Sequence, residues 1–459
     1  MKRILAALTA VFTLTSGLTV FAAEPDAPQE PILPPLPSIT VDMEGDKKPI
    51  SPYIYGVNDN YANENYDLVS PKSLRQGGNR TTGYNWETNY SNAGADWEHY
   101  NDDYMNMNLP EDIKFLPGAP ALNVANIAKE RNIGYKATTL QMAGYVAADM
   151  GIEGRNPVLE EEAAPSPRWK EVVARKGSDF VLDPDKDDDY VYMDEYVNYL
   201  VETLGDSQNG GFNGYLLDND PALWSETHPR IHPEKTGAKE LVDKGIELAG
   251  AVKDVDPNAE IIGPVLFGFG AYSNLAEAPD WEDVKGEHEW YVSYYLDQMA
   301  QAEEEAGRRL LDVFDVHYYS EAYTGLELNE NNQYQTTGHR VSNCPLEDCE
   351  ECAAERLQIV RTLWDSTYVN NFDEIPNVWD GAVHRGEKSW VNQWLFGFLP
   401  VLPRIQSDIE KYYPGTKLGI TEYNFGGGNN ISGAIAQADA LGVFGQQGVY
   451  LANLWALTN

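Results

Sequence analysis

Short apolar runs alternate with stretches of helical spacing along most of the chain, and this alternation predicts the fold. Eight apolar runs have the length and composition of buried strands: Ile50–Gly56, Ser73–Arg75, Tyr135–Leu140, Tyr215–Leu217, Glu260–Phe267, Val313–Tyr319, Leu418–Thr421 and Gly448–Trp455. Amphipathic stretches lie between them: Leu122–Arg131, Met193–Leu204, Gly237–Val252, Trp290–Leu311, Ala353–Trp364 and Leu402–Tyr412. Regular alternation predicts a parallel sheet of the α/β class, and eight strands predict a closed (β/α)8, TIM-like barrel over residues 50–459.

An open, doubly wound sheet is the alternative to this barrel. That fold carries a Gly-rich phosphate-binding turn after its first strand. No such turn follows Ile50–Gly56. The barrel is therefore the preferred interpretation.

The first 49 residues do not share this pattern. Residues 1–23 open with Lys2 and Arg3, continue as an uncharged, mainly apolar run, and reach small residues at Ala22 and Ala23. This order predicts a secretory signal peptide, with a membrane anchor as the alternative. Residues 24–38 are rich in Pro and Glu without periodicity, which predicts an extended linker. We therefore expect a secreted, extracellular protein that has no membrane attachment after cleavage.

Composition narrows the possible partners. The chain has a formal net charge of −39, which argues against nucleic acids and anionic lipids because both need a cationic face. The same charge disfavours polyanionic sugars such as pectin and favours a neutral polymer, although solubility alone also explains much of the acidity. Hydrophobic residues make up 42% of the chain, enough for one large core, and we expect a monomer.

Two of the predicted strands end in carboxylates. The run Tyr215–Leu217 leads directly into Asp218, Asn219 and Asp220, and the run Leu418–Thr421 leads into Glu422 and a Gly-rich loop. Chemistry in barrel enzymes takes place at the C-terminal ends of the strands. Hydrolysis of a glycosidic bond requires at least a pair of carboxylates, and two strand ends of this kind would supply them.

Several segments resemble one known family. The segments that carry the resemblance are Ile50–Asn58, Gly77–Glu87, Ser91–Gly94, Asn219–Trp224, Thr227–Pro233, Tyr412–Gly427, Ile431–Gly433 and Ala436–Asp439. They are similar to glycoside hydrolase family 44, and the resemblance runs from about Pro49 to Trp455. It implies a secreted, retaining endo-β-1,4-glucanase (a cellulase or xyloglucanase) whose substrates are β-glucans such as cellulose and xyloglucan. It also implies a small β-sandwich formed by the two chain ends.

The resemblance assigns roles to the residues at the strand ends. Glu422 takes the nucleophile position and Asp220 takes the acid/base position. Asn219 is expected to hold the sugar 2-hydroxyl, while His317 and Tyr319 are expected to orient Glu422 and line the cleavage subsite. The alternative for His317 is a histidine that serves only the core.

This chain departs from the family pattern in two ways. Asp220 stands where the family has Glu, so its carboxyl is set back by roughly a C–C bond of 1.5 Å. A displacement of about 1 Å can cost about a hundredfold in rate, so the alternative function is a glucan-binding homologue with impaired catalysis. The chain also ends at Asn459, after the eighth strand. Residues 39–49 would then supply the N-terminal strand of the sandwich, whose C-terminal part is missing.

Aromatic residues give a second indication of a sugar-binding cleft, because pyranose faces stack on aromatic rings. Trp86, Trp390, Trp394 and Trp455 all fall in loops or at strand ends on the predicted catalytic face. We therefore predict that they bind substrate. The alternative for each is a place in the hydrophobic core.

Metal sites are suggested in two places, although the chemistry requires no cofactor. His339, Cys344, Cys349 and Cys352 have zinc-like spacing, and a disulfide from Cys352 to Cys344 or Cys349 is the alternative. The family resemblance suggests a structural calcium, with oxygen donors from Glu87, Asp102 and Asp149.

Overall fold

The computed structural model describes residues 45, 47–58, 68–320, 322–328, 334–344, 349–366, 374–376, 383–385 and 400–455. The chain divides into two units, residues 1–47 and residues 48–459. The predicted signal peptide, linker and most of the predicted sandwich strand lie outside the described residues. Every helix in the described ranges is too short or too polar to cross a membrane.

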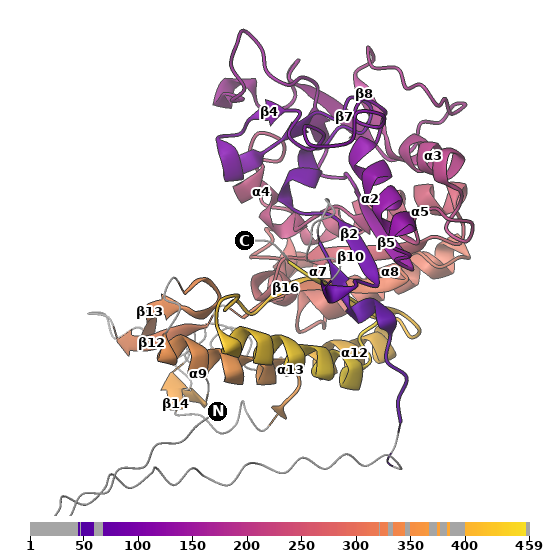
Figure 1. Ribbon diagram of the computed structural model, residues 1–459. Coiled ribbons are helices and arrows are strands. Elements are labelled where there is room, and N and C mark those ends of the chain that lie inside the picture. The colour runs from indigo at the N-terminus through magenta and orange to yellow at the C-terminus, as the bar shows by residue number, and fades with distance from the viewer. Residues whose placement is uncertain are drawn as a thin grey trace, which may run out of the picture. The chain divides into compact units, whose positions relative to one another are not determined.

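The second unit is built on a closed barrel of eight parallel strands (Figure 1). The strands, in chain order, are β1 (Gly56–Val57), β2 (Ser73–Gln76), β5 (Tyr135–Leu140), β9 (Gly214–Leu217), β10 (Glu260–Leu266), β11 (Val313–Tyr319), β16 (Lys417–Asn424) and β17 (Leu451–Leu454). Each strand pairs with its neighbour in this sequence, and β1 closes the ring by pairing with β17. The predicted (β/α)8 barrel is confirmed.

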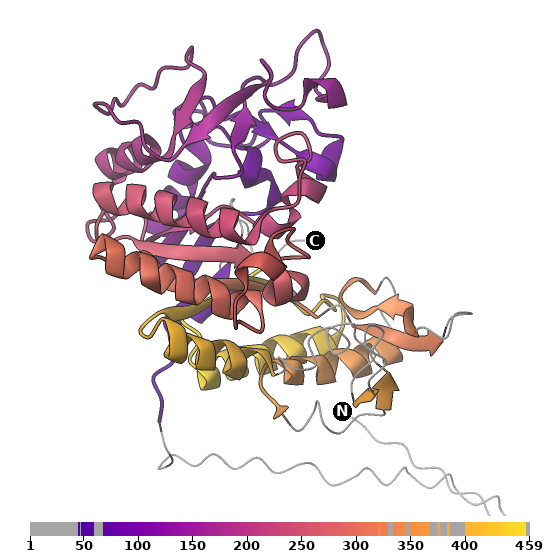
Figure 2. The same cartoon turned by 180° about the vertical axis from the view of Figure 1, so that it is seen from behind.

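Helices surround the barrel. Their bounds are α2 (Ala119–Glu130), α3 (Met193–Leu204), α4 (Trp224–Thr227), α5 (Ala238–Val255), α6 (Phe269–Asn274), α7 (Trp281–Val284), α8 (Tyr291–Ala306), α9 (Glu350–Ile359), α12 (Val401–Tyr412) and α13 (Ile431–Gln447). From behind, α3, α5, α8 and α12 pack one against the next (Figure 2). Their apolar faces cover the outside of the strands, as the spacing of Tyr196, Val197 and Leu200 in α3 predicts.

Several predicted boundaries differ from the structure by a few residues, for example Ala353–Trp364 against α9 and Gly448–Trp455 against β17, and two of the differences have a clear local reason. The first strand is only two residues long, because Pro52 opens a 3-10 turn (η1, Pro52–Ile54) that Ser51 caps through its hydroxyl. Helix α8 ends at Ala306 instead of Leu311, because Gly307 adopts a left-handed conformation with φ 66° and stops it.

The loops after three barrel strands contain small sheets that the sequence analysis did not predict. They are the pair β3 (Ser91–Asn92) and β4 (Asn101–Asp102), the three strands β6 (Tyr145–Ala147), β7 (Trp169–Val173) and β8 (Tyr190–Tyr192), the hairpin β12 (Tyr323–Leu328) and β13 (Tyr334–Arg340), and the pair β14 (Glu374–Pro376) and β15 (Val383–Arg385). The first two follow β2 and β5, and the last two follow β11. They therefore extend the barrel on the side where its strands end.

Two layers of side chains fill the inside of the barrel. Apolar side chains from five strands meet in one cluster: Tyr135, Ala137, Leu216, Ile262, Val265, Val313 and Leu451. Nearer the C-terminal ends of the strands, buried polar side chains replace them, including Arg75, Asp315 and His317. Buried charges need partners, so this polar layer marks the site.

Candidate active site

A β-bulge aims Glu422 into the barrel. The register between β11 and β16 shifts by one residue, so that His317 pairs with Glu422 and Thr421 is left as an extra residue. Simple alternation would turn Glu422 toward the surrounding helices. Asp315 holds the bulge, because its carboxylate accepts the Thr421 N–H at 3.0 Å and the Thr421 hydroxyl at 2.6 Å.

Glu422 is 6% exposed and bonded at both oxygens. Arg75 donates from Nη1 to Oε1 at 2.7 Å, and the Tyr319 hydroxyl donates to Oε2 at 2.9 Å. Burial by itself would raise the pKa of Glu422, but the positive charges of His317 and Arg75 and these hydrogen bonds hold that pKa below its ordinary value. Glu422 is therefore kept ionised, as a nucleophile must be.

The turn after β9 presents Asp220. Asp218 and Asp220 both have left-handed backbone conformations, with φ 62° and 46°, and Pro221 then starts the 3-10 turn η5 (Pro221–Leu223). Asp218 is fully buried and holds this turn. Its carboxylate accepts the Thr82 hydroxyl at 2.6 Å and the backbone N–H groups of Met142 and Ala143 at 2.6 and 3.0 Å.

His317 links the two predicted catalytic carboxylates. Its Nδ1 lies 2.7 Å from Oδ1 of Asp220 and 3.6 Å from Oε2 of Glu422. Burial lowers the pKa of His317, but the charges of Asp220 and Glu422 outweigh burial and hold that pKa above its ordinary value. One oxygen from each carboxylate and one His317 nitrogen all lie within 4.8 Å of one another. The prediction that these three side chains meet at one place agrees with this geometry.

Arg75 connects Glu422 to Asn219, and sequence reasoning missed it. Its Nη2 donates to Oδ1 of Asn219 at 2.6 Å, and Asn219 donates from Nδ2 to Oδ2 of Asp220 at 2.8 Å. The Gly78 N–H also donates to Oδ1 of Asn219, at 3.0 Å. The sequence did contain an indication of this contact, since Arg75 lies inside a short predicted barrel strand. A charge buried in such a strand needs a carboxylate partner.

The four predicted tryptophans have different positions. Trp455 is partly exposed at the end of β17, and its ring packs on Gly78, where an added Cβ would come within 2.6 Å of the ring. Gly78 is therefore required for that close contact. Trp86 is fully buried and stacks on Tyr196 with ring centroids 5.0 Å apart. The prediction that Trp86 binds substrate is corrected on this ground, since no face of its ring is open to a sugar.

Trp390 and Trp394 lie outside the described residues. Their predicted role in substrate binding stays a prediction.

The three predicted calcium ligands have basic partners from the protein itself. Glu87 pairs with Lys170 at 2.8 Å, Asp102 pairs with Arg80, and Asp149 pairs with Arg168 at 2.6 Å. Burial raises the pKa of Glu87 to about 7 despite the ion pair. The residues that the structure describes contain two groups with converging metal-ligand atoms, and neither includes these three acids.

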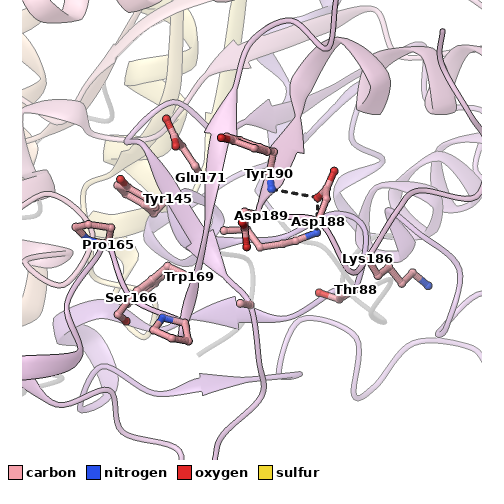
Figure 3. Close-up of a pocket in the computed structure, with 13 residues that line it drawn as sticks. Thr88, Tyr145, Pro165, Ser166, Trp169, Glu171, Lys186, Asp188, Asp189 and Tyr190 are labelled. Carbon is pink, nitrogen blue, oxygen red and sulfur yellow. Dashed lines mark hydrogen bonds and ion pairs between the residues drawn. The ribbon is translucent and has the colours of Figure 1, made fainter. Parts of the chain in front are cut away.

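A cavity of about 590 Å³ lies beside the sheet β6–β7–β8 (Figure 3). Tyr145, Trp169 and Tyr190 line it together with Lys170 and Asp188, whose side chains form an ion pair of 3.1 Å. None of the residues predicted to bind substrate or catalyse lines this cavity. It is separate from the site around Glu422.

The sequence and the structure both match known proteins. Residues 90–322 match the profile described as Glycoside hydrolase family 44. The chain is 45% identical over 420 residues to the β-mannanase/endoglucanase A of Caldicellulosiruptor saccharolyticus, and 46% identical over 422 residues to endoglucanase A of Paenibacillus lautus. Each alignment covers 91% of this chain, which spans 30% of the first relative and 55% of the second.

A solved structure agrees with the sequence matches. It is that of a Paenibacillus polymyxa xyloglucanase from family 44, determined with xyloglucan. Its TM-score is 0.78 at 48% identity, and the match covers 90% of this chain and 73% of that one.

Proposed function

The chain belongs to glycoside hydrolase family 44, and we propose that it hydrolyses the β-1,4-linked backbone of glucans from within the polymer. One observation supports this most directly. The carboxylates of Asp220 and Glu422, which come from different strands, meet around one His317 nitrogen at the C-terminal ends of the barrel strands. A buried pair of this kind suits cleavage of a glycosidic bond.

Glu422 acts as the nucleophile in this proposal. Arg75 and Tyr319 hold its carboxylate in one orientation and keep it charged. It attacks the anomeric carbon and forms a covalent glycosyl intermediate as the glycosidic bond breaks. Arg75 has a second role, because its contact with Asn219 places that amide where it can bind the sugar 2-hydroxyl.

Asp220 acts as the proton donor. It protonates the leaving oxygen, and in the second step it removes a proton from the water that hydrolyses the intermediate. His317 forms an ion pair with one oxygen of its carboxyl group and Asn219 donates to the other, so they fix its direction. His317 itself is anchored by the Tyr272 hydroxyl, which donates to its backbone carbonyl.

The carboxylate separation supports retention of configuration. Retaining enzymes have carboxyl groups about 5–5.5 Å apart, whereas inverting enzymes need about 6.5–9.5 Å to admit a water. One oxygen of Asp220 and one of Glu422 lie within 4.8 Å of each other, which is closer to the spacing of retaining enzymes than to that of inverting ones.

Xyloglucan and cellulose are the proposed substrates. The support is the family membership, together with relatives described as endoglucanases and a xyloglucanase solved with its polysaccharide. Trp455, beside Gly78 at the rim of the site, offers a ring for a glucose unit. Secretion through residues 1–23 and a monomeric state complete the proposal, as expected for an enzyme that meets an insoluble polymer outside the cell.

A glucan-binding protein with impaired catalysis is the second candidate, and the shorter side chain of Asp220 is the observation that favours it. Reducing ends released from xyloglucan and carboxymethyl cellulose separate the two functions when the chain is compared with its Glu422→Gln variant. We expect turnover in the unchanged chain, and loss of turnover with intact glucan binding in the variant. Equal background rates from both proteins would refute hydrolysis by this site.

A further inference from the structure

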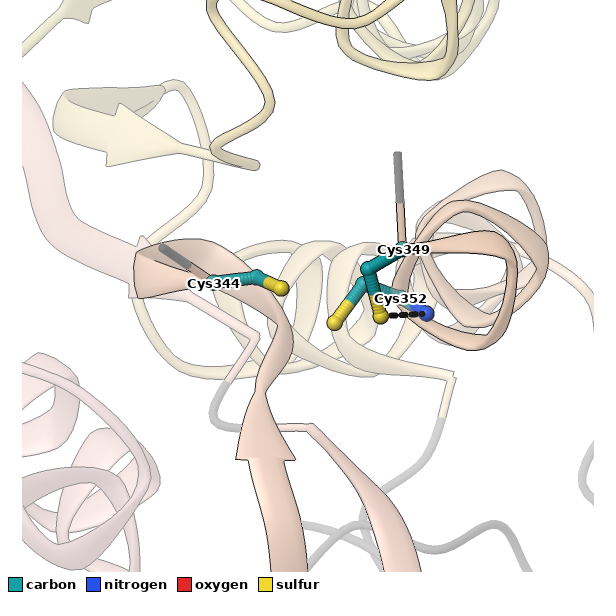
Figure 4. A group of neighbouring side chains, drawn as sticks. All are labelled: Cys344, Cys349 and Cys352. Atoms are coloured by element: carbon teal, nitrogen blue, oxygen red, sulfur yellow. Dashed lines mark hydrogen bonds between the residues drawn. The ribbon is translucent and has the colours of Figure 1, made fainter. Parts of the chain in front are cut away.

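Three cysteines gather in the segment that follows β11. Cys344 ends the 3-10 turn η6 (Val341–Asn343), Cys349 is the N-cap of α9, and Cys352 lies in the first turn of α9 (Figure 4). Their three sulfur atoms lie within 4.8 Å of one another. None of them forms a disulfide. The catalytic role proposed for Glu422 uses none of these residues.

His339 does not join this group. It lies in β13, just before η6 and Cys344, but its side chain is exposed and its backbone N–H donates to the Thr324 hydroxyl. His339 is therefore not the fourth ligand of the predicted zinc site. Among the described residues, three sulfurs and no other ligand atom make up the cluster.

The sulfur positions fit a metal ion better than a disulfide. Zinc–sulfur bonds of about 2.3 Å place the sulfurs of a tetrahedral site roughly 3.8 Å apart, so the cluster needs only a small contraction. The Cys352 N–H donates to the Cys349 sulfur at 3.2 Å, which stabilises negative charge on that sulfur.

We propose that Cys344, Cys349 and Cys352 bind one Zn²⁺ as thiolates, with a solvent molecule completing the tetrahedron. Each thiol loses its proton to solvent on binding, and no redox change is involved. Three thiolates and one Zn²⁺ carry a net charge of −1. Arg356, one turn further along α9, interacts electrostatically with all three cysteines and offsets this charge.

The same Arg356 connects the cysteine cluster to the loop after the nucleophile. Its guanidinium donates to the Phe425 carbonyl at 3.0 Å, to the Ser432 hydroxyl at 2.6 Å and to the Val341 carbonyl at 2.6 Å. Phe425 follows β16, which carries Glu422, and Ser432 opens α13. A metal that joins η6 to the start of α9 would therefore fix Arg356 and, through it, this loop.

Metal content tests the site without reference to hydrolysis, so the result does not depend on the proposed function. The full chain should be purified without chelator and analysed for zinc by mass spectrometry, and for free thiols after denaturation. We expect about one zinc per chain and three free thiols. Co²⁺ in place of Zn²⁺ should give the thiolate-to-cobalt charge-transfer absorption.

Single substitutions identify the ligands. Cys344→Ser, Cys349→Ser and Cys352→Ser should each lose most of the bound zinc, whereas the matched control His339→Ala should keep it. Loss of zinc from His339→Ala would overturn the three-thiolate site. Zinc that remains in all three Ser variants would identify adventitious metal and overturn it as well.

The unchanged chain gives a test that does not depend on how the variants fold. Alkylation of the three thiols under native conditions should be slower with Zn²⁺ present than after its removal by a chelator. An oxidised chain with a single free thiol and a mass lower by two hydrogens would show a disulfide, and would refute the proposal.

Discussion

Lengthening the acid by one methylene, in Asp220→Glu, should raise activity on natural substrates. The Asp220 carboxyl is set back by roughly 1.5 Å relative to a glutamate on the same backbone. A misplacement of about 1 Å costs about tenfold to a hundredfold in rate, which corresponds to a barrier difference of about 1–3 kcal/mol. The Asp220 side chain is 17% exposed, so packed protein does not enclose it on every side.

The choice of substrate isolates the proton-donation step. The leaving group of a cellooligosaccharide is a sugar alcohol of high pKa, which needs protonation by the acid. The leaving group of an aryl cellobioside is an acidic phenol, which departs with little protonation. We therefore expect Asp220→Glu to raise kcat/KM on oligosaccharides by about tenfold to a hundredfold and to change the aryl substrate little. The matched control Asp220→Asn keeps the side-chain length and removes the proton donor. It should lose kcat/KM on oligosaccharides and keep kcat/KM on the aryl substrate, while its kcat on the aryl substrate falls because Asp220 also acts as the base of the second step.

The comparison can also refute the reasoning. Equal oligosaccharide rates for the unchanged chain and Asp220→Glu would mean that the carboxyl of Asp220 already reaches the leaving oxygen. Loss of activity in Asp220→Glu would mean that the 2.7 Å contact with His317, which the longer side chain must rebuild, matters more than reach. If Asp220→Asn keeps full activity on oligosaccharides, another carboxylate is the acid, and the exposed Glu226 is the first to examine.

Three further changes test other parts of the site. Glu422→Gln should abolish hydrolysis and leave glucan binding nearly unchanged, as measured by turnover and by retardation in polymer-containing gels; retained turnover would remove Glu422 as nucleophile. Tyr319→Phe removes a hydrogen bond that lowers the pKa of Glu422, so the acid limb of the kcat/KM profile should move to higher pH, and an unmoved limb would contradict this contact. Trp455→Ala should raise KM about tenfold with little change in thermal stability, whereas Trp86→Ala should lower the unfolding free energy by about 3–5 kcal/mol. A destabilised Trp455→Ala or a stable Trp86→Ala with a raised KM would contradict these positions.

The fold could be predicted from the sequence because its elements follow simple periodicities. The bounds of β5, β11 and α3 agree with the predicted ones, since each is a strong apolar run or an amphipathic stretch with clear ends. The site was predictable as far as it lies on such elements, at the ends of β9 and β16. The structure differs from the predicted bounds where a single residue interrupts the periodicity, as Pro52 does at the first strand.

The remainder of the site depends on pairings that no local pattern reveals. Arg75 was missed because its partners Glu422 and Asn219 are 347 and 144 residues away in sequence. Trp86 was misassigned because a tryptophan in a loop has no periodicity to show that it packs on Tyr196. The inward turn of Glu422 depends on an extra residue in β16, which only the register with β11 defines.

The closure of the barrel determines when the site around Glu422 can form during synthesis. Gly56 of β1 pairs with Asn453 of β17, and Asn58 donates to the carbonyls of Thr421 and Asn453. Contacts between positions so distant in sequence form late, because the chain must first lose the entropy of a very long loop. The surroundings of Glu422 are therefore incomplete in a newly made chain until residues near 453 have emerged and docked, and the onset of the proposed hydrolysis would report this last step of folding.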